Sequence, residues 1–229
     1  MGLIFFIVIC AMFLSSCSGG LHDMVKGNIS EFREFVLAGQ TDEVYTELMC
    51  GQREIEYIVD GYSHELIPFG VLTFKFVEDV VPADENVTFV LFVGTQKFSG
   101  LCEKSPFDGS FAYDIKTIID KKQNVLVEVS VGDKKLSMKL NSVMIDWVIF
   151  GDEALEVFVN QYKQELKSLV KNGVFKGEVY VKIIGDYDGY FSGYLYYVNC
   201  IGQTGENMSI LVSPKTGNIL SSTSNMQTE

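Results

Sequence analysis

Short stretches of alternating apolar and polar residues fill most of the chain between residues 44 and 143, and they restrict its fold more than any other feature. A period of two places every second side chain on the same face of a β-strand. The stretch 87–93 is instead dense in β-branched and aromatic residues, as a strand buried on both faces would be. The predicted strands cover residues 44–48, 55–59, 67–77, 87–93, 111–119, 125–131 and 136–143.

These strands are short, and the segment that holds them has hardly any helical period. The first two are expected to form a hairpin around Gly51, because glycine is common in tight turns. The pattern predicts a mainly β protein in which residues 41–146 form an antiparallel β-sandwich. An immunoglobulin-like topology is our leading expectation for this sandwich, by analogy with other folds of this type.

Beyond Trp147 the pattern becomes that of a helix followed by further strands. Asp152 suits a helix start and Gly173 a helix end. One apolar stripe lies between them, formed by Leu155, Phe158, Val159, Tyr162, Leu166, Leu169 and Val170. Strands are predicted at 178–184, 190–200, 209–212 and 218–221. Residues 147–229 are therefore predicted to form a small α+β domain, with one long helix on an antiparallel sheet.

The last strands of this segment carry a short motif: Tyr197-Val198, then Gly205, then the run Ile210-Leu211-Val212-Ser213-Pro214-Lys215-Thr216-Gly217-Asn218-Ile219-Leu220. The motif resembles the end of a PepSY-type domain, where a Tyr-x-Val strand precedes a hairpin of the form Val-Asp-x-x-Thr-Gly-x-Val. Ser213 stands here where that family usually has Asp. In such a turn the glycine supplies the positive φ and the threonine holds its entry. The resemblance implies a PepSY/cystatin-like fold and an association with envelope proteins and propeptides, for which peptidase inhibition or regulation has been proposed. It brings no catalytic residues.

An unbroken apolar run occupies Leu3–Leu14. Twelve helical residues rise about 18 Å, which is short of the roughly 30 Å core of a bilayer, so the run has the length of a signal-peptide core. It leads into Ser15-Ser16-Cys17, which resembles the bacterial lipobox. The resemblance implies that residues 1–16 are a signal peptide, that Cys17 carries a diacylglycerol, and that residues 17–40 contain the lipidated cysteine and a tether.

The apolar run has no Lys or Arg before it, which departs from the usual signal pattern. Ordinary cleavage near residues 16–18 would release a soluble secreted protein, and retention of the run would leave a short anchor. Our expectation is an extracytoplasmic protein, anchored at the cell membrane or cell surface through Cys17.

The net charge of −12 and the arginine content restrict the partners of the chain. Its 18 basic residues include only two arginines, Arg33 and Arg53. An acidic chain with few arginines lacks the positive surface that grips phosphates, so we expect no nucleic-acid partner. An anionic lipid surface would also repel it, so the membrane contact is expected to come from the lipid anchor alone.

Cysteine and histidine do not form a recognisable catalytic or metal-binding motif. Cys50, Cys102 and Cys200 are the thiols beyond Cys17; Cys50 and Cys102 could form a disulfide across the sandwich, or all three could be free. His64 is expected in an exposed loop, with no Ser, Cys or Asp arrangement that indicates a triad. We therefore predict no metal, no cofactor and no catalytic residues.

Tyrosines are concentrated near one predicted turn, where Tyr187, Tyr190, Tyr194 and Tyr196 lie close together in the sequence. Tyrosine offers a large contact area at a low entropic cost, so these four residues are a candidate binding surface for a peptide or glycan. The alternative is that they fill the core between a sheet and a helix.

The sequence therefore favours a non-enzymatic binding or regulatory lipoprotein of the cell envelope, with an envelope protein, a peptide or a peptidase as its partner. Two alternatives stay open. One is an extracytoplasmic hydrolase whose site is assembled from scattered carboxylates, and the other is a structural subunit of a surface assembly.

Overall fold

The computed structural model describes residues 20–226, apart from positions 57, 78–79, 83–84 and 187–192. Cys17, Tyr187 and Tyr190 lie outside the described residues. Within this described part, no helix is both long and apolar enough to cross a membrane.

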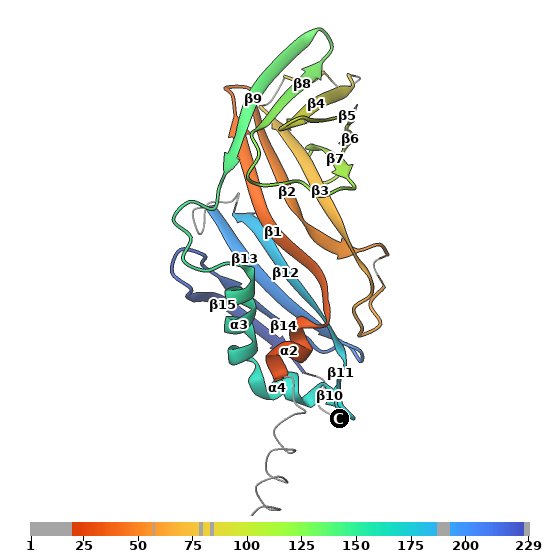
Figure 1. The fold of residues 1–229 in the computed structure, drawn as a ribbon, viewed down its shortest axis with the longest axis vertical. Helices are drawn as coiled ribbons and strands as arrows, with labels where there is room; N and C mark the ends of the chain where they lie inside the picture. The colour runs from red at the N-terminus through yellow and green to blue at the C-terminus, as the bar shows by residue number, and fades with distance from the viewer. Residues whose placement is uncertain (1–19, 57, 78–79, 83–84, 187–192, 227–229) are drawn as a thin grey trace, which may run out of the picture.

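The described residues form a mainly β protein with one thirteen-stranded sheet and a separate two-stranded hairpin (Figure 1). The order across the sheet is β15-β14-β13-β12-β1-β2-β3-β7-β6, and a branch β9-β8-β4-β5 leaves it at β1. The strands are β1 (Ile29–Gln40), β2 (Val44–Glu54), β3 (Leu66–Phe76), β4 (Val87–Val93), β5 (Gln96–Leu101), β6 (Glu103–Lys104), β7 (Phe111–Ile115), β8 (Val125–Val131), β9 (Lys134–Ser142), β12 (Gly177–Asp186), β13 (Gly193–Gly202), β14 (Asn207–Val212) and β15 (Ile219–Asn225), and the hairpin pairs β10 (Val170–Lys171) with β11 (Val174–Phe175).

Strand β1 holds the sheet together, because it pairs with three other strands. It runs antiparallel to β2 along most of its length, parallel to β12 near its start and antiparallel to β9 near its end. A bulge interrupts the β1–β2 register between Arg33 and Phe35, and Gly51 lies opposite it on β2. A side chain at Gly51 could not be accommodated, since a Cβ there would lie 2.1 Å from the Phe32 carbonyl oxygen. The glycine thus allows the close approach of the two strands at the bulge.

Three short helices cover one face of strands β12–β15 at the lower end of the molecule (Figure 1): α2 (Leu21–Lys26), α3 (Gly151–Gln161) and α4 (Lys163–Ser168). Buried apolar residues of these helices pack against the sheet. We call this cluster the helix-side core, and it includes Val25, Ile29, Val36, Trp147, Leu155, Phe158, Leu166, Val179, Val181, Ile183, Tyr196, Val198, Ile210 and Val212.

A second cluster fills the opposite end of the molecule, where the sheet curves so that β4, β8 and β9 lie across from β2, β3 and β7 (Figure 1). We call this cluster the sheet-side core, and it includes Phe35, Leu37, Leu48, Leu72, Phe74, Phe89, Leu91, Val127, Val129, Met138 and Leu140. Neighbouring residues of β1 enter different cores, since Val36 belongs to the first and Phe35 and Leu37 to the second. The period-two geometry of a strand produces this division.

The prediction of an immunoglobulin-like sandwich is wrong, because the structure has one continuous sheet. Pairs Leu37–Ser142 and Ala38–Asn141 join β9 to β1, and β6 pairs with β7, so the layers are connected by hydrogen-bonded strands. The predicted hairpin around Gly51 is also absent, since β2 passes straight through this residue. Residues 21–40, expected to belong to a tether, form α2 and the central strand β1.

The prediction of one long helix is wrong as well. The helix breaks at Tyr162, whose φ of −112° and ψ of 32° are not helical. Its single hydroxyl proton is shared between the carbonyls of Thr223 at 2.7 Å and Ser209 at 3.0 Å. Gly173 does not end a helix. With Asn172 it makes the turn of the β10–β11 hairpin, in which both residues have positive φ (53° and 78°). An Asn-Gly pair is the usual choice for such a two-residue turn.

The turn between β14 and β15 agrees with its sequence motif. Gly217 has a φ of 72°, and its N–H donates to the Ser213 carbonyl at 2.8 Å. The Thr216 hydroxyl accepts from the N–H of Asn218 at 3.3 Å. The positive φ expected at this glycine is therefore confirmed, whereas the threonine hydroxyl bonds at the exit of the turn.

Candidate functional site

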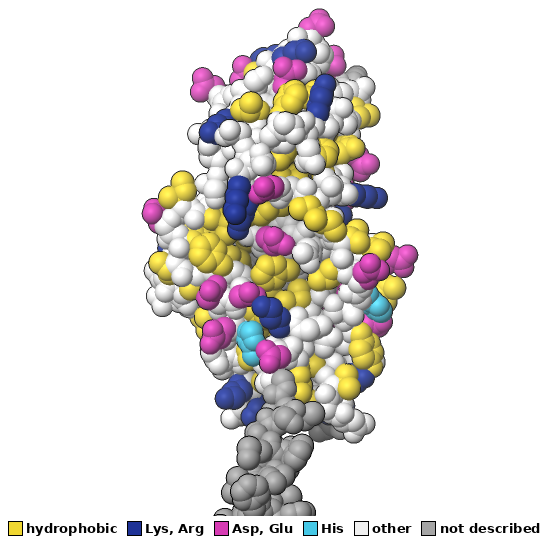
Figure 2. Space-filling view, in the orientation of Figure 1, with side chains coloured by type: hydrophobic (Ala, Val, Ile, Leu, Met, Phe, Trp, Pro, Cys, Tyr) yellow, Lys and Arg dark blue, Asp and Glu magenta, His cyan; other side chains and the backbone are white. Residues whose placement is uncertain are grey.

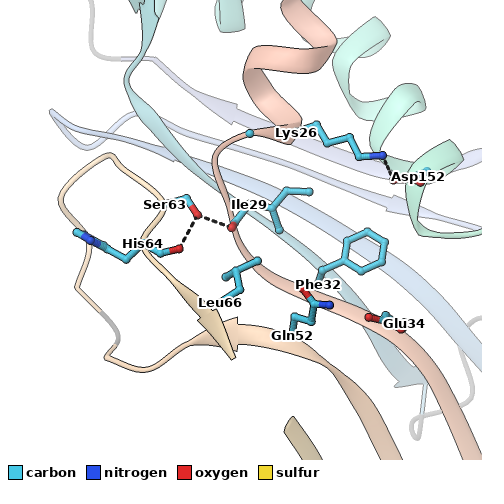
Figure 3. Close-up of a pocket in the computed structure, with 10 residues that line it drawn as sticks. Lys26, Ile29, Phe32, Glu34, Gln52, Ser63, His64, Leu66 and Asp152 are labelled. Atoms are coloured by element: carbon cyan, nitrogen blue, oxygen red, sulfur yellow. Dashed lines mark hydrogen bonds and ion pairs between the residues drawn. The ribbon is translucent and has the colours of Figure 1, made fainter. Parts of the chain in front are cut away.

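An open groove of about 470 Å³ lies between α2, the start of β1, the loop that joins β2 to β3, and the start of α3 (Figure 3). Its apolar residues are Ile29, Phe32 and Leu66, and its rim is polar and charged. In this groove, apolar side chains are reached from solvent between charged groups. We call it the groove and treat it as the candidate functional site.

The floor of the groove depends on close packing between α3 and β1. Gly151 opens α3 directly over Phe32, and a Cβ on this glycine would lie 2.4 Å from the Phe32 ring. Phe32 is only partly buried, so one side of its ring faces the groove (Figure 3). The glycine at the start of α3 thus leaves room for the Phe32 ring, which forms part of the floor of the groove.

The rim of the groove carries both charge signs. Lys26 of α2 and Asp152 of α3 form an ion pair with 2.9 Å between Nζ and Oδ1 (Figure 3). Both side chains are about half exposed, so the pair adds little stability, but it fixes the two helix ends beside each other. Glu34 and Gln52 are exposed on the opposite side of the groove. An occupant would therefore meet apolar surface in the middle and polar groups at both sides.

The loop that joins β2 to β3 is held in place by two buried carboxylates. Glu178, which is fully buried, accepts hydrogen bonds from the N–H groups of Asp60 at 2.6 Å and Gly61 at 2.8 Å. Glu54, which is 3% exposed, accepts one from the N–H of His64 at 2.6 Å. Hydrogen bonds to a carboxylate are stronger than those between neutral groups, so this wall of the groove is preorganised.

The serine and histidine beside the groove are engaged in structural contacts. The Ser63 hydroxyl donates to the Ile29 carbonyl at 2.6 Å, and the His64 ring points away from the groove toward Asp60 (Figure 3). Nε2 of His64 lies 3.0 Å from Oδ2 of Asp60. This contact raises the pKa of His64 and lowers the pKa of Asp60. The hydroxyl and the imidazole do not contact each other, so the pair lacks the geometry of an activated nucleophile.

Burial suppresses the chemistry of the three described thiols. Cys50, Cys102 and Cys200 are free and buried, and burial raises the pKa of each thiol to about 12. A thiol with such a pKa is not a nucleophile at neutral pH. Cys50 and Cys102 do not form a disulfide. Within the residues that the structure describes, no group of three or more His, Cys, Asp or Glu side chains is placed to hold a metal ion.

The described members of the tyrosine group do not form one surface. Tyr196 is fully buried in the helix-side core, with its ring 5.4 Å from that of Trp147. Tyr194 is half-buried, and its hydroxyl donates to Glu47 at 2.7 Å. Tyr196 therefore has a packing role, and Tyr194 joins β13 to β2. Tyr187 and Tyr190 lie outside the described residues.

Sequence reasoning missed the residues of the groove. Lys26, Ile29 and Phe32 fall within residues 17–40, which are predicted to contain the tether. Hydrophobic side chains gather over the middle of the face shown in Figure 2. Ile145, Val148 and Phe150 are exposed on the connection between β9 and α3 in that part of the molecule.

Comparison with known proteins identifies no relative. No family model matches the chain, no curated protein matches it, and no solved structure matches its fold.

Proposed function

We propose that the protein is an exported lipoprotein, anchored to a membrane through Cys17, which acts as a non-enzymatic binding module of the cell envelope. The groove would bind a short peptide segment of another envelope protein. The observation that carries this proposal is the groove itself, with its apolar floor of Phe32 and Leu66 between the Lys26–Asp152 ion pair and polar side chains of β1 and β2. Its volume of about 470 Å³ suits a small ligand or a few residues of a peptide.

The contacts around the groove favour binding over catalysis. The hydroxyl of Ser63 is used in a bond to the backbone of β1, and the imidazole of His64 is paired with Asp60. These bonds hold the wall of the groove in place, which lowers the entropic cost of binding. The resemblance of residues 197–220 to the end of a PepSY domain is the sequence support for a peptide partner.

The position of the groove agrees with an anchor at Cys17. The described chain starts at Gly20 and enters α2, which forms one wall of the groove (Figure 1). A lipid on Cys17 would hold this end of the molecule at the membrane, because each buried CH₂ contributes about 0.8 kcal/mol and two or three chains anchor firmly. The acidic chain would gain no attraction from anionic lipids.

Membrane fractionation of the wild type and of Cys17→Ala tests the anchor. The wild type is expected in the membrane pellet with an acylated Cys17 in its mature N-terminal peptide, and the variant in the soluble fraction or as uncleaved precursor. An unmodified Cys17 in the mature wild-type protein would contradict lipidation, and export would then be judged from its location alone.

Site-specific photo-crosslinking in cells tests the groove. A photoreactive amino acid at Gln52, which is exposed on the rim, is expected to capture one discrete envelope polypeptide. The matched control is the same amino acid at Asn141, which is exposed on β9 opposite Ala38 and does not line the groove. Equal capture from both positions, or none from Gln52, would contradict a binding role for the groove.

A further inference from the structure

Strands β5 and β7 each have an edge that is not fully paired, and the two edges face the same gap. Among the described strands β5 pairs with β4 alone, and β7 pairs with β3 and, at its beginning, with β6. The chain passes from β5 through Cys102 into β6, where Glu103 lies opposite Ala112. Continuation of this register would place Leu101 opposite Asp114 and Ser99 opposite Lys116, but no such pairs form.

The ladder between β6 and β7 therefore opens into a slot, which we call the seam, between residues 96–101 and 113–117. Two pockets line the seam, with volumes of about 540 and 570 Å³, and both contain Tyr113, Asp114 and Lys116. The seam is closed at the β6 end and widens toward Lys97 and Thr117. It lies in the half of the molecule opposite the helices (Figure 1).

Apolar side chains form the inner side of the seam. Tyr113 covers Gly100, since a Cβ on this glycine would lie 2.4 Å from the tyrosine ring. The same ring lies 4.8 Å from the ring of Phe89 in the sheet-side core. Phe98 is also partly buried against this core. The seam thus has an apolar floor that could receive every second side chain of an added strand.

The outer side of the seam is basic, which is unusual for a chain of net charge −12. Lys97 and Lys116, which line the two pockets, form no ion pair with a carboxylate in the described part of the chain, whereas Asp114 pairs with Arg53 at 2.6 Å. Glu103 is the one other acidic residue that lines these two pockets. Two lysines against one uncompensated carboxylate give the seam a positive outer surface.

We propose that the seam binds an extended segment of a partner protein, in which apolar residues alternate with acidic ones, as an added strand between β5 and β7. Its backbone would pair with the free edges, its apolar side chains would contact Tyr113 and Phe98, and its carboxylates would contact Lys97 and Lys116. Strand β7 offers the three positions from Tyr113 to its end at Ile115, so the segment paired with it spans about 10 Å. This interaction surface is separate from the groove and does not depend on its function.

Amide hydrogen exchange with a defined probe tests the proposal on the full chain in mild detergent. The probe is the capped peptide Glu-Val-Glu-Val-Glu-Val. It is expected to slow exchange in residues 96–101 and 113–117 at least ten-fold at saturation, because only amides that enter the ladder gain protection. The same peptide with Lys in place of Glu, and one N-methylated at alternate amides, are expected to give no protection there.

Charge-reversal variants distinguish binding of the peptide at the seam from nonspecific electrostatic binding elsewhere on the protein. The double variant Lys97→Glu with Lys116→Glu is expected to bind the acidic peptide with about ten-fold lower affinity at low salt. Lys163→Glu with Lys215→Glu changes two exposed lysines in the other half of the molecule by the same charge, and should alter the affinity less than two-fold. Protection at any place other than the seam, equal binding of the lysine or N-methylated peptide, or a seam already protected by self-association would each overturn the proposal.

Discussion

Two hydrophobic cores share strand β1, and they are enclosed in different ways. The helix-side core lies between a sheet and three helices, so separate layers close it. The sheet-side core is enclosed by the curvature of the sheet, with β4, β8 and β9 opposite β2, β3 and β7. In the first case side-chain packing completes the enclosure, and in the second the enclosure depends on hydrogen bonds between strand edges.

This difference explains where the two candidate binding regions occur. Where the helices pack on the sheet, a groove lies between the helix ends and strand β1, close to Phe32 and Gly151. A curved sheet that does not close leaves a pair of free edges, as between β5 and β7. Each core therefore offers a different type of surface: side-chain contacts at the groove and backbone hydrogen bonds at the seam.

The largest expected effect comes from truncating one large side chain in each core. Phe158→Ala should lower the free energy of unfolding by about 3–5 kcal/mol and Leu91→Ala by about 2–5 kcal/mol, because both residues are fully buried. Since β1 contributes to both cores, each variant should shift one common transition. The measurement is denaturant unfolding followed by tryptophan fluorescence, which reports the helix-side core through Trp147, and by circular dichroism.

Two separate transitions would break this comparison. If Leu91→Ala lowered the midpoint by circular dichroism and left the Trp147 signal unchanged, the two cores would unfold independently. Strand β1 would then not couple them.

The next effect concerns the ionic contacts between β1 and β12. Glu31 is 3% exposed, and its carboxylate lies 2.6 Å from Nε of Arg33 and 2.9 Å from Nζ of Lys182. Glu31→Gln would leave two cations partly buried near each other, so we expect a loss of about 3 kcal/mol in the free energy of unfolding. Glu34→Gln, on the exposed side of the same strand, should cost less than about 0.5 kcal/mol. Equal losses in the two variants would show that burial of the network does not matter.

Much of the local structure could be predicted from the sequence, but its assembly could not. The strands predicted at 87–93 and 125–131 have the bounds of β4 and β8, because period and composition are local properties. The pairing of β9 with β1 depends on the curvature of the whole sheet, which no local pattern contains. Tyr162 fits the apolar stripe of a helix, yet its hydroxyl bonds to β14 and β15 where the helix breaks.

The groove could be predicted even less. It combines residues from α2, β1, the loop that joins β2 to β3, and α3, and none of them has an unusual type or spacing. Glu178 illustrates the problem, because in the sequence it is one of 30 acidic residues. Only the fold shows that it is buried and that it holds the backbone of Asp60 and Gly61.

A smaller effect is expected for the hydroxyl that joins β13 to β2 on the side of the sheet that faces the helices. Tyr194 donates to Glu47 at 2.7 Å, and Glu47 is 6% exposed. Tyr194→Phe should lower the free energy of unfolding by about 1–3 kcal/mol, since it removes a hydrogen bond from a buried carboxylate. A double-mutant cycle with Glu47→Gln measures the coupling directly. Additive losses would mean that the bond does not stabilise the contact between these strands.

The smallest effect concerns the pH dependence of the wall of the groove, where Asp60 and His64 form an exposed pair. The hydrogen bond raises the pKa of His64 in the folded state above its ordinary value of 6.5, so its contribution to stability is complete below that value and is lost as the pH rises through the folded pKa. Asp60 has a lowered pKa, so it stays ionised well into the acidic range. The free energy of unfolding, measured from pH 5.5 to 8.5, should therefore fall slightly more for the wild type than for His64→Gln. Added salt should reduce the difference, because both side chains are exposed. Parallel pH curves for the two proteins at low salt would mean that Glu54 and Glu178 hold this wall without help from the pair, and the groove would then keep its shape across the whole range.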